Sequence, residues 1–306
     1  MSGRPQLDHP LVHRLLARTR FPPAGTAVRC GVSGGADSTA LAVLAVAAGC
    51  DAELVHVDHG LRPGSAAEAE VVASTAAALG ARFTSVTVVV GDGPDLEARA
   101  REARHEALGP EALLGHTADD QAETVLLALL RGAGPTGLAG IPPARRPLLD
   151  LRRADTEALC RAVGLRWVDD ESNRDPRFRR NRIRHEVLPL LCDVAGRDVV
   201  PLLVRSAGHE RDAADALDLL ACELDPTDAA VLRAAPRALA TTAVRRWWRE
   251  ATGSAYAPDT AAVDRILAVA ASEAEAADVV GGWRVARTGG RLRLVPPAGL
   301  ATEGHK

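Results

Sequence analysis

Lysine is almost absent from this sequence. Of the 37 basic side chains in the 306 residues, Lys306 is the only lysine, and every other one is arginine. High-GC codon usage explains the bias, but the physical consequence is the same whatever its cause. No interior lysine is available as a phosphate-binding point charge, a Schiff base or a general base. Mechanisms that require such a lysine are therefore excluded.

Cysteines in metal-binding spacing are also missing. None of the five cysteines forms a C-x-x-C pair with another, so the pattern indicates neither a zinc or iron–sulfur site nor a disulfide framework. The five are Cys30, Cys50, Cys160, Cys192 and Cys222. We expect buried, reduced thiols, which are typical of cytosolic proteins.

Long apolar segments are lacking as well. The first twenty residues contain charged side chains and no signal-like apolar core. The longest uncharged apolar run, from Thr39 to Cys50, is too short to cross a bilayer. We therefore expect a soluble, cytoplasmic protein with no membrane partner.

The net charge is only −3, so no overall field indicates a polyanionic partner, and a nucleic-acid surface would have to be local. Residues 174–184 form such a patch, because Asp175 is their only acid and Phe178 their only aromatic residue. Its arginines are Arg174, Arg177, Arg179, Arg180, Arg182 and Arg184. A solvated helix face normally alternates charge signs, whereas clustered arginines favour contacts with phosphates and unpaired bases.

Strand-like and helix-like segments alternate through the first two hundred residues. Apolar runs typical of strands lie at 26–32, 52–57, 82–90 and 112–115. Helical patterns follow them from Ser38 and at 66–79, 95–108 and 118–131. This alternation predicts an α/β fold with a doubly wound, mostly parallel sheet of Rossmann-like type and right-handed crossovers. The Gly- and Pro-rich segment 131–149 is predicted to be a loop.

The pattern changes near residue 201. Residues 202–272 carry the apolar spacing of successive helices, in which we expect Trp247 and Trp248 to pack in a core or an interface. The end alternates around Gly289-Gly290, which predicts a hairpin. We therefore divide the chain into an α/β domain, residues 1–200, and a smaller, mainly helical domain, residues 201–306, that ends in a short β-hairpin.

The string SGGADS, residues 33–38, joins the first strand to the following helix. Gly34 and Gly35 permit positive φ and close approach of a phosphate, and the helix start adds backbone N–H donors. Asp37 would repel a bare phosphate, so its presence predicts Mg²⁺ between the two. A plain turn with Asp and Ser as helix caps is the alternative, but the complete string after a strand favours phosphate binding. The lysine of a G-x-x-x-x-G-K-[ST] loop is absent.

Three acids, Asp119, Asp120 and Glu123, begin the helix after the fourth strand. Asp120 and Glu123 stand three residues apart, so they share one helix face and suit a cationic ligand. Acids in a first turn also complement the helix dipole, which is a strong explanation in isolation. His116 and Thr117 precede them and either cap the helix or reach a nucleotide.

His56, Asp58 and His59 stand at the end of the second strand, where open α/β sheets bind ligands. Contact with adenosine or cytidine and a polar strand-end turn explain Asp58 and His59 equally well. Arg104, on the helix 95–108, is predicted to face a phosphate or an RNA.

Five motifs together resemble a known family. They are SGGADS, HVDHGLR (56–62), LGHTADDQAETVLLALLRGAGPTGLAGI (114–141), RPLLDLRRADTEALC and DDESNRDPRFRRNRIRHEVLP (169–189). The first resembles the PP-loop of the N-type ATP pyrophosphatases, and the set over residues 26–190 is similar to the tRNA(Ile)-lysidine synthase family. The last motif is the most specific of the five.

The resemblance implies an activity and its partners. ATP adenylates the oxygen on carbon 2 of the wobble cytidine in the isoleucine tRNA with a CAU anticodon. The ε-amine of free L-lysine then attacks that carbon, giving lysidine, AMP and pyrophosphate. The resemblance further implies Mg²⁺ as cofactor, tRNA binding by the helical domain, and assembly as a homodimer.

The resemblance also assigns roles to residues. Asp37, Asp120, Glu123 and Arg104 are the implied catalytic residues, with Mg²⁺ reached from Asp37 through phosphates and lysine bound by Asp120 and Glu123. ATP binding falls to Ser33, Gly34, Gly35, Ala36, Asp37, Ser38, His56, Asp58, His59 and His116. tRNA binding falls to Arg174, Arg177, Arg179, Arg180, Asn181 and Arg184. Where the family usually reads A-R-x-x-R-Y, this chain has His105 in place of tyrosine.

Other readings remain open. A PP-loop enzyme that inserts sulfur into tRNA would commonly use C-x-x-C cysteines, which this chain lacks. A non-catalytic nucleotide-binding module would explain the glycine-rich turn but not the paired carboxylates or the arginine run. An ammonia-using synthetase would require a glutaminase, for which no Cys/His arrangement is present.

Overall fold

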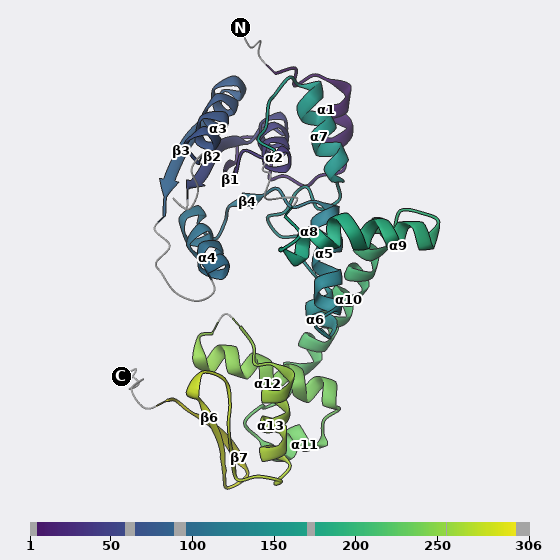
Figure 1. Cartoon of the computed structure of the whole chain (residues 1–306). Coiled ribbons are helices and arrows are strands. Elements are labelled where there is room, and N and C mark those ends of the chain that lie inside the picture. The colour runs from purple at the N-terminus through teal and green to yellow at the C-terminus, as the bar shows by residue number, and fades with distance from the viewer. Residues whose placement is uncertain (1–4, 59–64, 89–95, 170–174, 255, 298–306) are drawn as a thin grey trace. The chain divides into compact units, whose positions relative to one another are not determined.

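A four-stranded parallel sheet forms the centre of the N-terminal part of the chain (Figure 1). Its strands are β1 (Ala27–Gly31), β2 (Asp51–Asp58), β3 (Arg82–Thr87) and β4 (Leu113–Leu114), in the order β3-β2-β1-β4. All three pairings are parallel. The predicted sheet is therefore confirmed, and its order reverses between β1 and β4.

The computed structural model describes residues 5–58, 65–88, 96–169, 175–254 and 256–297. The chain divides into two compact units, residues 1–208 and 209–306. The division falls inside α10 (Val200–Ala221), whose first residue is the boundary expected from the sequence.

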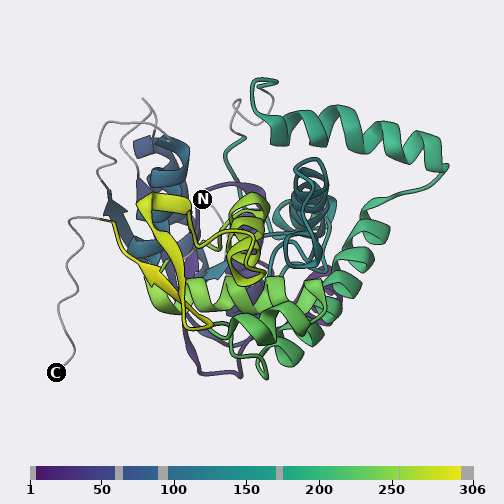
Figure 2. The ribbon, with the colours of Figure 1, turned by 90° about the horizontal axis from the view of Figure 1, so that it is seen from below.

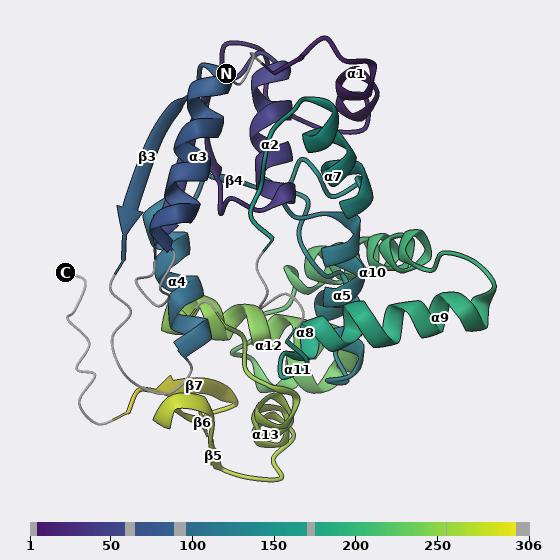
Figure 3. The ribbon, with the colours of Figure 1, turned by 45° about the horizontal axis from the view of Figure 1, so that its top comes forward.

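Helices cover both faces of the sheet, because alternate residues of each strand point to opposite sides. Leu54 of β2 packs in one apolar cluster with α2 (Ala36–Ala47), whereas its neighbour Val55 packs in another with Leu108 of α4 (Leu96–Leu108). Helix α2 is buried along most of its length, and α3 (Ser65–Leu79) and α7 (Arg153–Ala162) contact it from either side (Figure 3). Helix α1 (Pro10–Leu16) packs on α2 and α7.

The segment after β4 carries α5 (Ala118–Leu129) and the short α6 (Pro135–Leu138). Buried Gln121 holds the Gly-rich loop that follows, accepting from the Ile141 N–H at 2.6 Å and donating to the Ala139 carbonyl at 3.2 Å. A Cβ at Gly140 would lie 2.6 Å from the Gln121 amide, so this loop position requires glycine.

A basic segment near the end of the first unit forms α8 (Arg179–Arg182), a π-helical turn (Ile183–Val187) and α9 (Leu188–Ala195). Ile183 and Leu188 pack on α5 beside the start of α10. Single π-helical turns are rare in proteins, and those that occur are often found at functional sites.

The second unit contains α11 (Ala229–Ala234), α12 (Arg237–Thr252) and α13 (Thr260–Ala270), followed by a three-stranded antiparallel sheet (Figure 2, green to yellow). Strands β6 (Arg284–Thr288) and β7 (Arg291–Val295) form the predicted hairpin. The third strand, β5 (Ala276–Asp278), was not foreseen because its three residues carry no alternating apolar pattern.

The core of the second unit is apolar. Trp248, Ile266, Val285 and Leu292 are buried in one cluster, and the ring of Trp248 meets that of Trp283 edge-on at 6.0 Å. The expectation that Trp248 packs in the core is confirmed. None of the helices in the described ranges is long and apolar enough to span a membrane.

Candidate active site

The loop between β1 and α2 has the geometry of an anion nest. Gly34 adopts φ +89°, and the N-cap of α2, Gly35, provides no side-chain cap. The first N–H groups of a helix have no partner within the helix, so those of α2 remain available to a ligand. Ser38 stabilises the turn, donating from its hydroxyl to the Gly35 carbonyl at 3.0 Å and accepting from the Ser33 N–H at 3.2 Å.

Two neighbouring segments press against this loop. Gly115, directly after β4, lies so close to α2 that a Cβ there would sit 2.8 Å from the Asp37 carbonyl oxygen. On the other side, the Val168 N–H donates to the Gly34 carbonyl at 2.9 Å. The loops after β1 and β4 flank the point where the strand order reverses, which is where open α/β sheets bind ligands.

Asp37, in the first turn of α2, is held from α7. The Thr156 hydroxyl donates to Asp37 Oδ1 at 2.5 Å, and an Arg153 guanidinium nitrogen lies 3.2 Å from Asp37 Oδ2. The Asp37 side chain is only 17% exposed. Its desolvation outweighs the Arg153 charge and raises the pKa of Asp37 from 3.8 to about 6.

The first turn of α5 faces the same start of α7. Asp119 receives a bidentate contact from Arg152, at 2.9 and 3.0 Å, and the Arg153 backbone N–H at 2.8 Å. Burial opposes ionisation of Asp119, but these hydrogen bonds prevail and lower its pKa. Asp120 caps the N-terminus of α5: one of its carboxylate oxygens accepts from the Thr117 backbone N–H at 2.9 Å. The other oxygen lies 3.1 Å from an Arg153 guanidinium nitrogen.

Glu123, one turn further along α5, is fully buried. Arg184, from the π-helical turn, contacts both oxygens of Glu123, at 2.6 and 3.1 Å, and lies 3.6 Å from Asp120. Arg180 adds a nitrogen 3.2 Å from Glu123. Desolvation still raises the pKa of Glu123 despite the Arg184 hydrogen bond. Because one guanidinium touches both carboxylates, Asp120 and Glu123 share a face, as their spacing predicts.

The structure separates the predicted RNA-contacting arginines into two groups. Arg180 and Arg184 turn inward to Glu123, as described above. Arg177 and Arg179 are exposed, and Arg177 pairs with Asp175 at 2.7 Å. Asn181 is buried and donates to the Asp175 carbonyl at 2.9 Å, so its amide braces the turn. Arg174 lies outside the described residues.

The histidines near the strand ends differ in exposure. His56 is 2% exposed, and its Nδ1 lies 3.1 Å from the Val32 carbonyl, directly before the glycine-rich loop, while its Nε2 has no hydrogen-bond partner among the described residues. His56 thus supports the loop backbone. Asp58 and His116 are half-buried beside the ends of β2 and β4. His59 lies outside the described residues.

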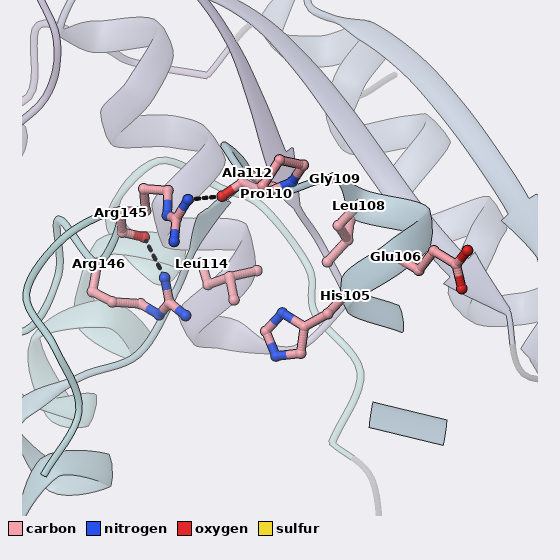
Figure 4. Close-up of a pocket in the computed structure, with 9 residues that line it drawn as sticks. All are labelled: His105, Glu106, Leu108, Gly109, Pro110, Ala112, Leu114, Arg145 and Arg146. Atoms are coloured by element: carbon pink, nitrogen blue, oxygen red, sulfur yellow. Dashed lines mark hydrogen bonds between the residues drawn. The ribbon is translucent and has the colours of Figure 1, made fainter. Parts of the chain in front are cut away.

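A pocket of about 420 Å³ lies between the end of α4 and residues 145–146 (Figure 4). His105, the residue in place of the family's tyrosine, lines it together with Arg145 and Arg146. The Arg145 guanidinium donates to the Pro110 carbonyl. Arg104 is exposed on the same helix.

The residues of this site fit a magnesium–nucleotide. Mg²⁺ in nucleotide sites is commonly bound by one or two carboxylates together with phosphate oxygens, and Asp37 stands beside the uncapped start of α2. Within the described ranges, no three His, Cys, Asp or Glu side chains group into a site made of protein ligands alone. A magnesium ion would therefore need the phosphates to complete its coordination, with Asp37 as its protein ligand.

Arg152, Arg153 and Thr156 were missed as site residues. They lie in the motif RPLLDLRRADTEALC, whose residues carry no assigned role in the sequence analysis. Two adjacent arginines at a helix start are unusual, because cations oppose the helix dipole there. That conflict is the signal that they pair with acids from another element.

Comparison with known proteins agrees with this geometry. The PP-loop domain family matches residues 11–191, and the TilS substrate binding domain matches residues 228–293. The chain is 47% identical over 244 residues to a tRNA(Ile)-lysidine synthase of Nocardia farcinica, covering 74% of this chain and 77% of that protein. It is 41% identical to one of Salinispora arenicola, covering 92% and 94%.

A solved structure supports the fold. The U34-tRNA thiolase of Methanococcus maripaludis superposes with a TM-score of 0.52 at 14% identity, covering 66% of this chain and 79% of that one. At that identity the likeness concerns the fold alone. The family matches and the extended sequence identity carry the assignment: the chain belongs to the tRNA(Ile)-lysidine synthase family and pairs its PP-loop domain with a smaller substrate-binding domain.

Proposed function

We propose that this protein ligates free L-lysine to carbon 2 of the wobble cytidine in the isoleucine tRNA with a CAU anticodon, using Mg²⁺ and ATP. One observation carries the proposal beyond family membership. A single side chain connects the carboxylate pair Asp120 and Glu123 to the glycine-rich loop. Arg153 contacts both Asp120, of this pair, and Asp37, which follows the loop. A cation-binding pair thus adjoins an anion nest.

The phosphate loop positions the nucleotide. N–H groups at the uncapped start of α2 and the hydroxyls of Ser33 and Ser38 would hold phosphate oxygens. Bound Mg²⁺ supplies neutralisation of phosphate charge as pyrophosphate leaves. Asp37 would hold that ion, and the Thr156 hydroxyl fixes the Asp37 carboxylate in place. Catalysis at this step is mainly positioning and electrostatic stabilisation.

The acidic face of α5 selects the nucleophile. Asp120 and Glu123 would bind the charged groups of free lysine and orient its ε-amine towards the activated cytidine. Glu123 sits in a dry environment, so an ion pair there is stronger than it would be in water. Since the amine attacks only when unprotonated, a carboxylate whose pKa is raised by burial is suited to receive its proton.

The tRNA would be bound by surfaces on each unit. Exposed Arg177 and Arg179 lie next to the inward-facing Arg180 and Arg184, so the same short segment spans solvent and site. The substrate-binding domain match at 228–293 supports a second contact from the C-terminal unit. Because tRNA, ATP and free lysine are cytoplasmic, we place the protein in the cytoplasm. We also propose a homodimer, which light scattering of the purified protein tests.

Sulfur transfer is the competing function, since the structural neighbour is a thiolase. Persulfide chemistry needs a reactive thiolate. Burial raises the pKa of Cys30 and Cys160 to about 12, and the five cysteines are unpaired with one another. The Cys30 and Cys160 thiols are therefore suited to packing, which favours lysine ligation, whereas Cys222 is exposed, contrary to the expectation of buried thiols.

The test is incorporation of radiolabelled lysine into a CAU-anticodon isoleucine tRNA transcript, with and without ATP. We expect ATP-dependent labelling by the wild type, reduced at least about a thousandfold in Asp37→Ala and Asp120→Ala because each loses a charged site group. Glu186→Gln is the matched control, since Glu186 is an exposed carboxylate of the π-helical turn and pairs with Arg182 of α8. Consumption of ATP on tRNA without lysine incorporation would contradict the proposal.

A further inference from the structure

Four carboxylates and four arginines meet where the helices α2, α5 and α7 begin. The acids are Asp37, Asp119, Asp120 and Glu123, and the arginines are Arg152, Arg153, Arg180 and Arg184. The formal charges of these eight groups cancel, and Arg152 has a further acidic partner in Asp198, so the carboxylates are already paired with arginines before any substrate is present. MgATP and lysine bring further charged groups of both signs to these carboxylates, so an arginine that already occupies the carboxylates they use would have to change partner.

Arg153 is the one arginine of this group that joins the two halves of the site. One of its terminal nitrogens lies 3.2 Å from Asp37 in the phosphate loop helix, and the other lies 3.1 Å from Asp120 in the proposed lysine site. Arg152 instead contacts Asp119 and Asp198, and Arg180 and Arg184 contact the acids of α5.

We infer that Arg153 is a positioning residue that couples nucleotide binding to lysine binding; this inference rests on the proposed function. In the empty protein its guanidinium occupies the Asp120 oxygen that a lysine ammonium would use. When Asp37 holds Mg²⁺, the Arg153 guanidinium would lose that partner, and it would move from Asp120 towards the phosphate oxygens. Nucleotide binding thereby vacates the lysine site.

The surroundings of Arg153 are consistent with a change of partner. Among the residues that the structure describes, the buried Arg153 Nε has no hydrogen-bond partner, although the Arg153 side chain is 30% exposed overall. Its backbone stays anchored, because its N–H donates to Asp119. Asp120 is also held without Arg153, by the backbone N–H and hydroxyl of Thr117 at 2.9 and 3.0 Å. The guanidinium can therefore leave while the carboxylate keeps its place.

The coupling is measured by equilibrium dialysis of labelled lysine, with and without Mg²⁺ and α,β-methylene-ATP, which cannot be cleaved at the reacting bond. In the wild type we expect nucleotide to raise lysine affinity by about 5- to 150-fold, and lysine to raise nucleotide affinity by the same factor. Arg153→Gln should bind lysine more tightly than the wild type without nucleotide, and nucleotide should no longer change that affinity.

Two further variants serve as controls for charge and for folding. Arg153→Lys keeps one positive charge and the fold, but an ammonium is a point charge that cannot span both carboxylates as a planar fork does. Its coupling should fall below about threefold. Arg161→Gln removes an exposed arginine of the same helix, paired with Glu157, and should couple like the wild type.

The outcomes separate this inference from the proposed function. Lysine affinity that ignores nucleotide in the wild type, or coupling that persists in both Arg153 variants, overturns the inference. Weaker lysine binding by Arg153→Gln without nucleotide also overturns it, because a merely structural role predicts that loss. Formation of lysidine in the tRNA by the wild type is followed separately by mass spectrometry, and its absence would overturn the proposed function instead.

Discussion

The two units of this protein bury different chemistry. Every buried polar or charged side chain in the described ranges lies before residue 209, and none lies in the C-terminal unit. The ion pairs of the C-terminal unit, such as Arg237–Asp264 and Arg291–Asp225, lie at its surface. The first unit therefore contains charged side chains that are shielded from water, whereas the second unit folds around a core of apolar side chains.

The pKa values of two aspartates, one in each unit, are shifted in opposite directions. Desolvation raises the pKa of Asp37 to about 6 in the first unit. In the second unit, hydrogen bonds from Thr227 and Arg291 lower the pKa of Asp225 to about 2. One environment penalises the ionised carboxylate and the other stabilises it, so the two respond to pH with opposite sign.

Trp248→Ala should produce the largest loss of stability. It removes a buried indole from an apolar core, which typically costs about 3–5 kcal/mol in the free energy of unfolding. Urea denaturation followed by circular dichroism measures it, with Tyr256→Ala, at a side chain 74% exposed, as the control. If the second unit serves only to bind tRNA, nucleotide affinity should not change. A loss below about 1 kcal/mol would show that the core repacks.

Asp37→Asn should stabilise the metal-free protein at neutral pH while abolishing activity. Because the folded pKa of about 6 exceeds the unfolded value of 3.8, the native state binds the proton more tightly. Wild-type stability therefore falls as pH rises from 4 to 6 through this group, by about 2–3 kcal/mol. Urea denaturation in EDTA at pH 4, 6 and 8 should show the variant's advantage growing with pH. A constant difference across pH would contradict the raised pKa.

Gly115→Ala tests the tight contact between β4 and α2. The new Cβ would lie 2.8 Å from the Asp37 carbonyl and 3.1 Å from the Ser38 nitrogen, so α2 must shift. We expect a loss of about 1–2 kcal/mol, together with weaker nucleotide binding in calorimetry. Gly208→Ala is the matched control. It has open space and lies within α10, so alanine there should stabilise by about 0.5–1 kcal/mol.

Asp225→Asn should have the smallest effect and the opposite dependence on pH. Its folded pKa is depressed, so its contribution is present above pH 4 and lost as pH falls through about 2. The side chain is 47% exposed, and solvent screening limits the loss to less than about 1 kcal/mol at pH 7. Thermal unfolding at pH 7 and pH 3 measures it. A larger loss at pH 3 than at pH 7 would reverse the assigned sign.

Much of the fold followed from local patterns. The four parallel strands, their crossover helices and the hairpin at Gly289-Gly290 agree with the expectations, because each element carries its own apolar period or turn residues. Strand β5 did not follow, since three residues carry too little pattern. The division between the two units lies inside α10, where a continuous helical pattern carries no local mark of a boundary.

For the site, spacing placed Asp120 and Glu123 on one face but could not say what faces them. The six arginines of 174–184 read as one basic surface, yet Arg180 and Arg184 point to a buried carboxylate while Arg177 and Arg179 face solvent. A π-helical turn changes the angular spacing within this run, and no residue pattern announces it. The roles assigned to these residues remain predictions.

The sequence by itself determined the glycine-rich loop after β1, the parallel sheet around it and the family, because glycines, apolar periods and motif spacings are local properties of the chain. Only the tertiary structure decided which arginine meets which acid. Arg153 is 116 residues from Asp37 and 33 from Asp120 along the chain, yet it touches both. Ion pairing acts over a few ångströms of space, and three helix starts reach that distance only when the sheet and α7 are packed.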